Sequence, residues 1–537
     1  MKSTPNPLLL MIALIVCAGP FARAEEGADE KQTEALVAAA AQGDVAAATK
    51  LLDAGVDVNA KTNEGLTILM IAVAGQQGNG HEVEMMKLLL DRGAKIDAKD
   101  ARGYTAAWYA AWAGLSPEGL QLLIDKGADV KAVVPKEGTI LHHVGDYAPS
   151  DKMDPKEKAR REDNLRKTVE ILVKAGVDVN AKDAGGQTAL AKFADFGEPV
   201  LVDEALAHGA DVNVTDDSGR TALLNALQPS FARPPDVAMV DELLAHGADA
   251  TIGTNNPAGK GDTPSPLKSA IIGGHYYAND DQQARRAMFK KLMDKGARFA
   301  CEKESDTEAL LTAASLGDVA KVKELLAKGV KAGAADDRGW TALMSAAGLG
   351  YNEVADALLD AGADVNARDA DNFTALWLEV SCGTDPQRVE ALAGRKADPN
   401  IAAAGFYGTV LGRAVLRKDI KVVETLLNAG ADPNQTIGMP GQTETETALQ
   451  AAVQKRQAAI VKLLLDHKAD PNPRSMENRS PLYWAIDYGE VEMVKALLAA
   501  GAKTDVVSAY HESIQDEAER SDNAEIKELI RKAVGGK

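Results

Sequence analysis

The stretch Gly362-Ala363-Asp364-Val365-Asn366, followed by Thr374-Ala375-Leu376, contains the unit from which this chain is built. A turn rich in Asp and Asn leads to a Thr-x-Leu that opens an apolar segment. The turn begins with Gly or, in two copies, Lys, and this residue recurs at positions 55, 93, 127, 176, 209, 247, 296, 329, 362, 396, 430, 468 and 501. The basal step is 33 or 34 residues, lengthened in places to 38 or 49. Such a period predicts a repeat protein.

Each repeat has the residue pattern of two short helices. Thr is a good N-cap, because its hydroxyl can accept a hydrogen bond from a free amide of the first turn. Apolar residues then follow at helical spacing, as in Leu343, Ala346 and Ala347. A second apolar run follows, and glycine after it suits a left-handed C-cap. One such unit cannot bury its apolar face alone, so we expect neighbouring repeats to stack into a continuous core.

The repeat resembles the ankyrin repeat, whose signature is Thr-Pro-Leu-His. Ala replaces the proline in most copies, Ser480-Pro481-Leu482 keeps it, and Thr139-Ile140-Leu141-His142 keeps the histidine. The Ala-containing copies include Thr188-Ala189-Leu190, Thr221-Ala222-Leu223, Thr341-Ala342-Leu343 and Thr447-Ala448-Leu449. The resemblance covers nearly everything after residue 32. It implies an all-α helical solenoid of about 13–14 repeats with β-turn fingers.

The first 24 residues have a different pattern. A basic start at Lys2, an apolar run from Leu8 to Ala18 and a small-x-small site at Ala22-Arg23-Ala24 predict a cleaved signal peptide, residues 1–24. The run is too short to span a bilayer, and no later stretch is long and apolar enough. We therefore expect a periplasmic or secreted protein without a membrane span.

The repeats are expected to form two segments. Thr33-Glu34-Ala35-Leu36 and Thr307-Glu308-Ala309-Leu310 begin similar repeats that lack the preceding turn, as N-terminal capping repeats do. This predicts an N-terminal solenoid at residues 31–299, a hinge at 300–306 and a C-terminal solenoid with its cap at 307–534.

The charge and cysteine content narrow the choice of partner. Without residues 1–24, the chain has 58 basic and 79 acidic residues, a net charge of −21, which repels nucleic acid. Of the remaining cysteines, Cys301 and Cys382 lie about three repeats apart. We therefore expect no internal disulfide. The sequence favours another protein as the partner.

Two kinds of residue are candidates for partner binding. Aromatic side chains at positions expected to face the inner groove are Tyr109, Trp112, Trp484 and Tyr488, and they compete with a simple packing role. Arg413, Arg417 and Lys455 belong to a basic cluster that is either a solvated face or a docking point. Four inserted loops, near Gly75, Gly145, Gln228 and Gly273, are expected to line one edge, and the last carries Tyr276 and Tyr277.

Catalytic and cofactor signals are weak. The glycines from Gly253 to Gly261 do not match a phosphate loop, and turns such as Asp211-Val212-Asn213 lack calcium-loop spacing. His208, His246 and His467 hold one repeat position near a helix end, which does not indicate a metal set. We expect no catalytic residues, no cofactor and no metal. An enzyme that uses His275, Tyr276 and Tyr277 is the competing interpretation.

The resulting hypothesis is a non-enzymatic binding scaffold of the periplasm that uses its concave groove and turn tips. Two alternatives remain within binding: an immunity or inhibitor protein that neutralises a secreted enzyme, and a secreted, host-directed effector. An acidic surface would suit a basic target.

Overall fold

The computed structural model divides the chain into two compact units. The first comprises residues 1–231 and 236–263, and the second comprises residues 232–235 and 264–537. The predicted hinge at 300–306 falls within the second unit in this division. The signal segment at 1–24 lies outside the described residues, which are 28–62, 64–75, 81–112, 116–145, 154–227, 236–252, 265–272, 282–299, 305–383, 385–403, 408–437, 446–475, 478–509 and 512–535.

A single repeat, formed by α17 (Ala342–Leu349) and α18 (Asn352–Asp360), shows why the sequence folds as a helix pair. The Thr341 side chain accepts a hydrogen bond from the Met344 amide at 3.2 Å, which begins α17. Gly350 ends the helix in the left-handed region, at φ 69°. All residues of α17 are buried, whereas α18 buries only one face. The first helix therefore lies between neighbours, and the second faces solvent.

The first unit follows this plan with one departure. In the fourth helix pair, the first helix is a short 3-10 helix, η2. The second helix of this pair, α8, is extended to 20 residues. The side chains of Arg161 on α8 and Glu198 form a buried ion pair at 3.0 Å. The pairs are α2 (Ala28–Gln42) and α3 (Val45–Asp53), α4 (Ile68–Ala74) and α5 (His81–Asp91), α6 (Ala106–Ala111) and α7 (Pro117–Asp125), η2 (Ile140–His143) and α8 (Pro155–Lys174), α9 (Ala189–Phe196) and α10 (Pro199–Ala207), and α11 (Ala222–Leu227) and α12 (Val237–Ala245).

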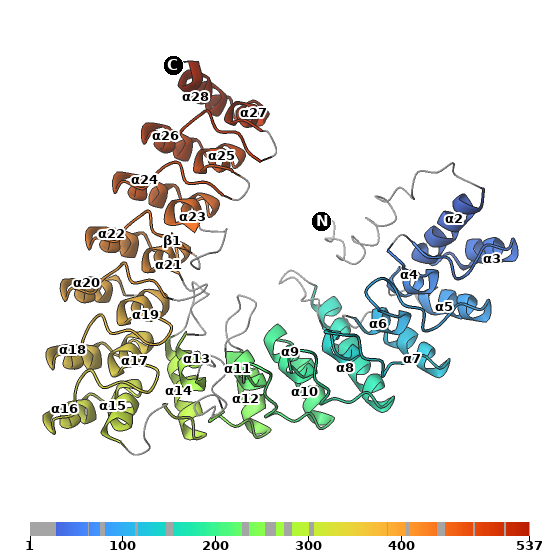
Figure 1. Ribbon diagram of the computed structural model, residues 1–537, viewed down its shortest axis with the longest axis horizontal. Coiled ribbons are helices and arrows are strands. Elements are labelled where there is room, and N and C mark those ends of the chain that lie inside the picture. The colour runs from blue at the N-terminus through green and yellow to red at the C-terminus, as the bar shows by residue number, and fades with distance from the viewer. Residues whose placement is uncertain are drawn as a thin grey trace. The chain divides into compact units, whose positions relative to one another are not determined.

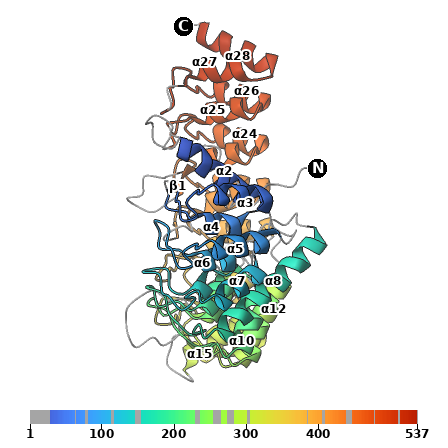
Figure 2. The same ribbon diagram turned by 90° about the vertical axis from the view of Figure 1, so that its right-hand side faces the viewer.

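The second unit arranges most of its helices in two rows, with first helices in one row and second helices in the other (Figure 1). Its turns near α25 and α27 project to one side of the helices (Figure 2). Besides α17 and α18, its pairs are α13 (Pro266–Ile272) and α14 (Gln282–Asp294), α15 (Asp306–Ser315) and α16 (Val319–Ala327), α19 (Ala375–Cys382) and α20 (Pro386–Gly394), α21 (Val410–Leu416) and α22 (Ile420–Asn428), α23 (Ala448–Gln454) and α24 (Ala458–Asp466), α25 (Pro481–Asp487) and α26 (Val491–Ala499), and α27 (Ile514–Arg520) and α28 (Ala524–Gly535).

The segments between repeats form short β-turn fingers, as the resemblance implied. In the finger between α22 and α23, β1 (Thr436–Ile437) pairs antiparallel with β2 (Glu446–Thr447). In three other described fingers a single bridge closes the finger at the Thr that caps the next helix, as between Ala335 and Thr341. The same threonine therefore ends the finger and begins the helix.

Where the turn carries an asparagine two residues after its aspartate or at the equivalent position, that asparagine joins the repeat to the next one. Asn366 donates from Nδ2 to the carbonyl of Lys396 at 3.0 Å and accepts the amide of Asp398 at 2.7 Å. Asn400 makes the same two bonds to Gly430 and Asp432. Equivalent bridges are made by Asn59, Asn180, Asn213, Asn434 and Asn472. The side chain of the recurrent Asn thus bonds to the next repeat. From the sequence, this residue was expected only to stabilise its own turn.

The two lysines that replace the turn glycine adopt the glycine backbone conformation. Lys396 and Lys468 both have φ 66°, while Gly362 has φ 87° and Gly430 φ 92°. A Cβ atom placed on either of these glycines would meet nothing within 4 Å. A side chain therefore fits at this position in space, and only the left-handed backbone opposes it.

Candidate protein-binding surface

A stacked pair of aromatic side chains lies partly exposed on α25, the first helix of the last repeat but one. Trp484 of α25 and Tyr488, its C-cap, are one helical turn apart, with ring centroids 5.8 Å apart and planes inclined by 29°. Both side chains are half-buried. Tyr483 of the same helix is buried, and its hydroxyl donates to Glu512 at 2.8 Å. The helix therefore packs through one aromatic residue and presents the other two.

Two arginines bracket this pair. The guanidinium of Arg456 lies 5.8 Å from the ring centre of Tyr488 and donates to the Tyr488 carbonyl at 3.1 Å. The guanidinium of Arg479 lies 4.9 Å from the ring centre of Trp484. We call Arg456, Arg479, Trp484 and Tyr488 the α25 surface. Aromatic and arginine side chains dominate the binding energy of many protein interfaces, and here each arginine is already oriented over a ring.

The basic residues predicted to cluster on neighbouring repeats have separate roles. Arg413 is buried, with its guanidinium 5.8 Å from the Trp377 ring centre. Arg417 donates to the carbonyls of Ser381 and Gly383, at 2.7 and 2.9 Å, at the end of α19. Lys455 is exposed. The two arginines thus hold adjacent repeats together, because they bind carbonyls or rings of the preceding repeat.

In the first unit, the predicted aromatic candidates belong to a packed cluster. Tyr109 is buried, and its hydroxyl donates to Asp100 at 2.8 Å. Trp112 is half-buried, with its ring centroid 5.7 Å from that of Trp108, which lies 4.8 Å from the His143 ring. Tyr109 therefore occupies a core position, where the sequence analysis had expected a groove-facing one. The helical spacing of these residues fits both a core position and a groove-facing position, so it does not distinguish the two.

The inserted edge is described only in part. Tyr276 and Tyr277 lie outside the described residues, as do His275 and most of the inserted loop residues. The described part of the fourth insertion from the N-terminus contains no partner-binding candidate. The earlier insertion near Gly145 continues into α8, which accounts for that helix's length.

A feature that the sequence analysis missed is the position of α13 and α14. Their most extensive contacts with other helices of the second unit are with α17 and α19. Lys268 of α13 forms ion pairs with Asp369 and Asp371 in the finger before α19. A lysine within an apolar helix was the available signal, because a buried ammonium requires carboxylate partners.

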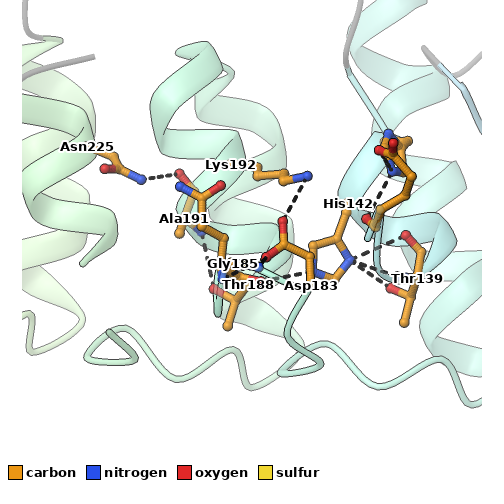
Figure 3. Close-up of polar contacts among 11 residues, drawn as sticks. Thr139, His142, Asp183, Gly185, Thr188, Ala191, Lys192 and Asn225 are labelled. Carbon is orange, nitrogen blue, oxygen red and sulfur yellow. Dashed lines mark hydrogen bonds and ion pairs between the residues drawn. The ribbon is translucent and has the colours of Figure 1, made fainter. Parts of the chain in front are cut away.

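The histidine retained from the Thr-x-x-His signature is a structural bridge. One ring nitrogen of His142, Nδ1, lies 3.0 Å from Thr139 Oγ1, and the other, Nε2, lies 3.1 Å from the Gln187 carbonyl of the next repeat. Burial lowers the pKa of His142. Figure 3 shows this contact beside the ion pair of Lys192 with Asp183, at 3.2 Å, and the bond from Asn225 to Ala191. The bonds of His142 and Asn225 connect neighbouring repeats, and the ion pair of Lys192 lies within one repeat.

Within the described ranges, no three His, Cys, Asp or Glu side chains gather as metal ligands do. Likewise, no helix among these residues is long and apolar enough to cross a bilayer. The thiol of Cys382 is free and buried.

The paired helices, capping threonines and linking turns define a repeat protein. The chain belongs to the ankyrin-repeat family. The family profile of ankyrin repeats matches residues 27–133, 158–254, 274–369 and 411–508. Domains of this family are generally non-catalytic modules that bind proteins.

Individual relatives match only parts of the chain. An ankyrin repeat protein of fowlpox virus is 35% identical over 156 residues, which are 28% of this chain and 33% of the relative. The channel pyrexia of Drosophila melanogaster is 33% identical over 117 residues, 22% of this chain and 12% of the relative. Cyclin-dependent kinase 4 inhibitor B of Rattus norvegicus is 30% identical over 128 residues, 23% of this chain and 92% of the inhibitor. The chain thus spans a third or less of the first two relatives.

Two solved structures are similar to parts of the chain. The ankyrin repeat domain of Bcl-3 matches 42% of this chain and 97% of its own, with 24% identity and a TM-score of 0.35. A chain from the complex of a Bdellovibrio bacteriovorus predatory endopeptidase with an immunity protein matches 39% of this chain and 97% of its own, with 28% identity and a TM-score of 0.31.

Proposed function

We propose that this chain is a non-enzymatic scaffold that binds another protein, and that the α25 surface is its main contact. The observation that carries the proposal is the half-exposed stack of Trp484 and Tyr488 between Arg456 and Arg479. These side chains are held in place by contacts within the unit, so less conformational entropy is lost when a partner covers them. The fingers beside this surface would supply polar contacts at its rim.

The predicted signal segment supports a periplasmic or secreted location, which belongs to the same proposal. Fractionation of the native host would test it: mature chain in the periplasmic fraction or the medium, lacking residues 1–24, is the expected result. Full-length chain confined to the cytoplasm would contradict it.

The binding proposal is tested in two stages. A tagged full chain is cross-linked in its native host, and each captured protein is then produced separately and titrated against the purified chain. We expect the double variant Trp484→Ala, Tyr488→Ala to weaken binding at least tenfold, since each ring is expected to contribute more than about 1 kcal/mol. Ile420→Ala is the matched control, because Ile420 is a 43% exposed apolar residue at the start of α22, in the other row. Equal affinities of the two variants would refute the assignment of the α25 surface.

An inhibitor of a secreted enzyme is the second candidate. The net negative charge of the chain would attract a basic enzyme, and the relative matched over 92% of its length is by name an enzyme inhibitor. If a captured partner is a hydrolase, its activity is measured with and without the purified chain. Unchanged activity at saturation would leave the scaffold role and exclude inhibition of that enzyme.

A further inference from the structure

The α13–α14 hairpin lies against the row of first helices of the second unit, beside α17 and α19, although α15 and α16 follow it in sequence (Figure 1). We call the side of α17 and α19 that the hairpin covers the inner face. Its Lys268 ammonium is 5% exposed and contacts the carboxylates of Asp369 and Asp371. The ammonium also lies 5.0 Å from the ring centre of Phe373 and 5.6 Å from that of Trp340. Two carboxylates and two aromatic faces form a site with the chemistry that recognises a lysine.

The other helix of the hairpin binds carbonyl groups at helix ends. Arg285 donates to the Gly348 carbonyl at 2.7 Å and to the Cys382 carbonyl at 3.2 Å, near the C-termini of α17 and α19. Arg286 donates to the carbonyls of Leu349 and Gly350, at 2.7 and 2.8 Å. The last carbonyls of a helix have no partner within the helix and carry its negative dipole end, so cationic side chains suit them.

Apolar contact completes the interface. A Cβ atom on Gly348 would lie 2.4 Å from Cγ2 of Ile271, so α13 approaches α17 closely enough to require a glycine. The Cys382 thiol of α19 contacts the Ile271 carbonyl at 3.4 Å and is fully buried. Gly348 lies within α17, where glycine is otherwise unfavourable, and its backbone does not need positive φ. The close approach of Ile271 accounts for it.

We propose that the α13–α14 hairpin is an internal ligand of the inner face at α17 and α19, and that this face binds a basic amphipathic helix of a partner protein when the hairpin is displaced. The hairpin interacts as a partner would, through charged side chains, carbonyl caps and one close apolar contact. A competing helix would carry a lysine and, one turn later, a β-branched residue, as Lys268 and Ile271 do. This inference rests on the proposal that the second unit binds proteins, and it assigns that role to a second place on the unit.

Thiol labelling of Cys382 measures displacement of the hairpin. The full chain is prepared with Cys17→Ser and Cys301→Ser, which leaves Cys382 as its one cysteine. Burial shields this thiol and raises its pKa, so labelling of the parent protein should be slow. We expect Lys268→Met with Arg285→Met to speed labelling at least tenfold. Lys290→Met, on the exposed side of α14, should leave the rate unchanged.

A second variant, Gly348→Ala, changes the face on α17 and leaves the α13–α14 hairpin unaltered. Gly348→Ala should also speed labelling at least tenfold, because its methyl group would overlap Ile271, while alanine favours the helical backbone of α17. This variant keeps every charge, so it remains informative if the double variant fails to fold. Labelling as slow as in the parent protein, in a folded Gly348→Ala chain, would overturn the internal-ligand proposal.

Binding in trans is measured with a synthetic peptide of residues 264–299. The peptide should bind the double variant, whose site is intact and whose own hairpin is weakened, and a peptide with Lys268→Met should bind at least tenfold more weakly. It should not bind the Gly348→Ala chain. If the double variant labels rapidly but binds neither peptide, the hairpin is a packed repeat and no ligand site exists. None of these readouts depends on Trp484 or Tyr488, so failure of the α25 surface would be recognised separately.

Discussion

Replacement of Lys396 by glycine should stabilise the second unit. Lys396 has φ 66°, and a left-handed conformation costs a residue with a side chain about 1–2 kcal/mol. Glycine avoids that cost but loses about 0.5–1 kcal/mol of additional chain entropy on folding. Lys396 is exposed, so removal of its side chain should cost little packing. The net expectation is a gain of about 0.5–1 kcal/mol.

The assay is urea unfolding of the full chain, followed by circular dichroism and by hydrogen exchange of α19 to α22. Exchange in these helices reports the local change even if the array does not unfold in one step. The Lys396 carbonyl still accepts its bond from Asn366, because the glycine retains that group.

Lys328 provides a matched control for the lysine substitution. It is an exposed lysine one residue before a turn glycine, at the C-cap of α16, and its φ is −76°. Lys328→Gly should therefore destabilise by about 0.5–1 kcal/mol. If Lys396→Gly and Lys328→Gly shift the free energy of unfolding in the same direction, the argument from backbone conformation is refuted.

Three further outcomes are expected. Asn366→Ala should cost about 1–2 kcal/mol, since two bonds to the next repeat are lost, and faster hydrogen exchange in both flanking repeats would show it; an unchanged rate would contradict the bridging role. Thr188→Ala should cost about 1 kcal/mol of helix-cap stability in thermal unfolding, and Thr188→Ser should restore most of it. Burial raises the pKa of Glu379 to about 7, so the folded state favours the protonated acid. The contribution of Glu379 to the free energy of unfolding is therefore fully present below pH 4.5 and is lost as the pH rises to 7. Glu379→Gln should remove a decline of about 3 kcal/mol across this range, and parallel stability curves of the two proteins would contradict it.

The helix-pair architecture could be predicted because its determinants are local. Thr341 caps a helix whichever repeat follows it, and the left-handed glycines recur at a basal step of 33 or 34 residues. Even the substituted turn at Lys396 keeps the glycine conformation. Each repeat therefore carries its own instructions, and agreement between copies strengthens the prediction.

The site was harder to predict because exposure depends on neighbours. Tyr109 and Trp484 hold the same position after their capping residues, yet Tyr109 is buried in an aromatic cluster that includes Trp108, and Trp484 is half-exposed. Helical spacing is equal in the two repeats, so only the packed structure separates them. The hairpin was missed for a related reason, since repeats are expected to stack on the next one in sequence. Lys268 pairs instead with Asp369, 101 residues away.

That long-range ion pair changes how the second unit would respond to a pulling force. In a simple array, tension applied at one end peels off the terminal repeat first, because each repeat is held only by its neighbour. Here a force applied at α13 is transmitted through Lys268 to the finger before α19. The helices from α15 to α18 lie in the stretch of chain that this ion pair closes into a loop, so they do not carry the force directly. The hairpin contact must rupture before these repeats extend. The second unit would therefore act as a mechanical clasp, yielding in one large step when Lys268 leaves Asp369 and Asp371.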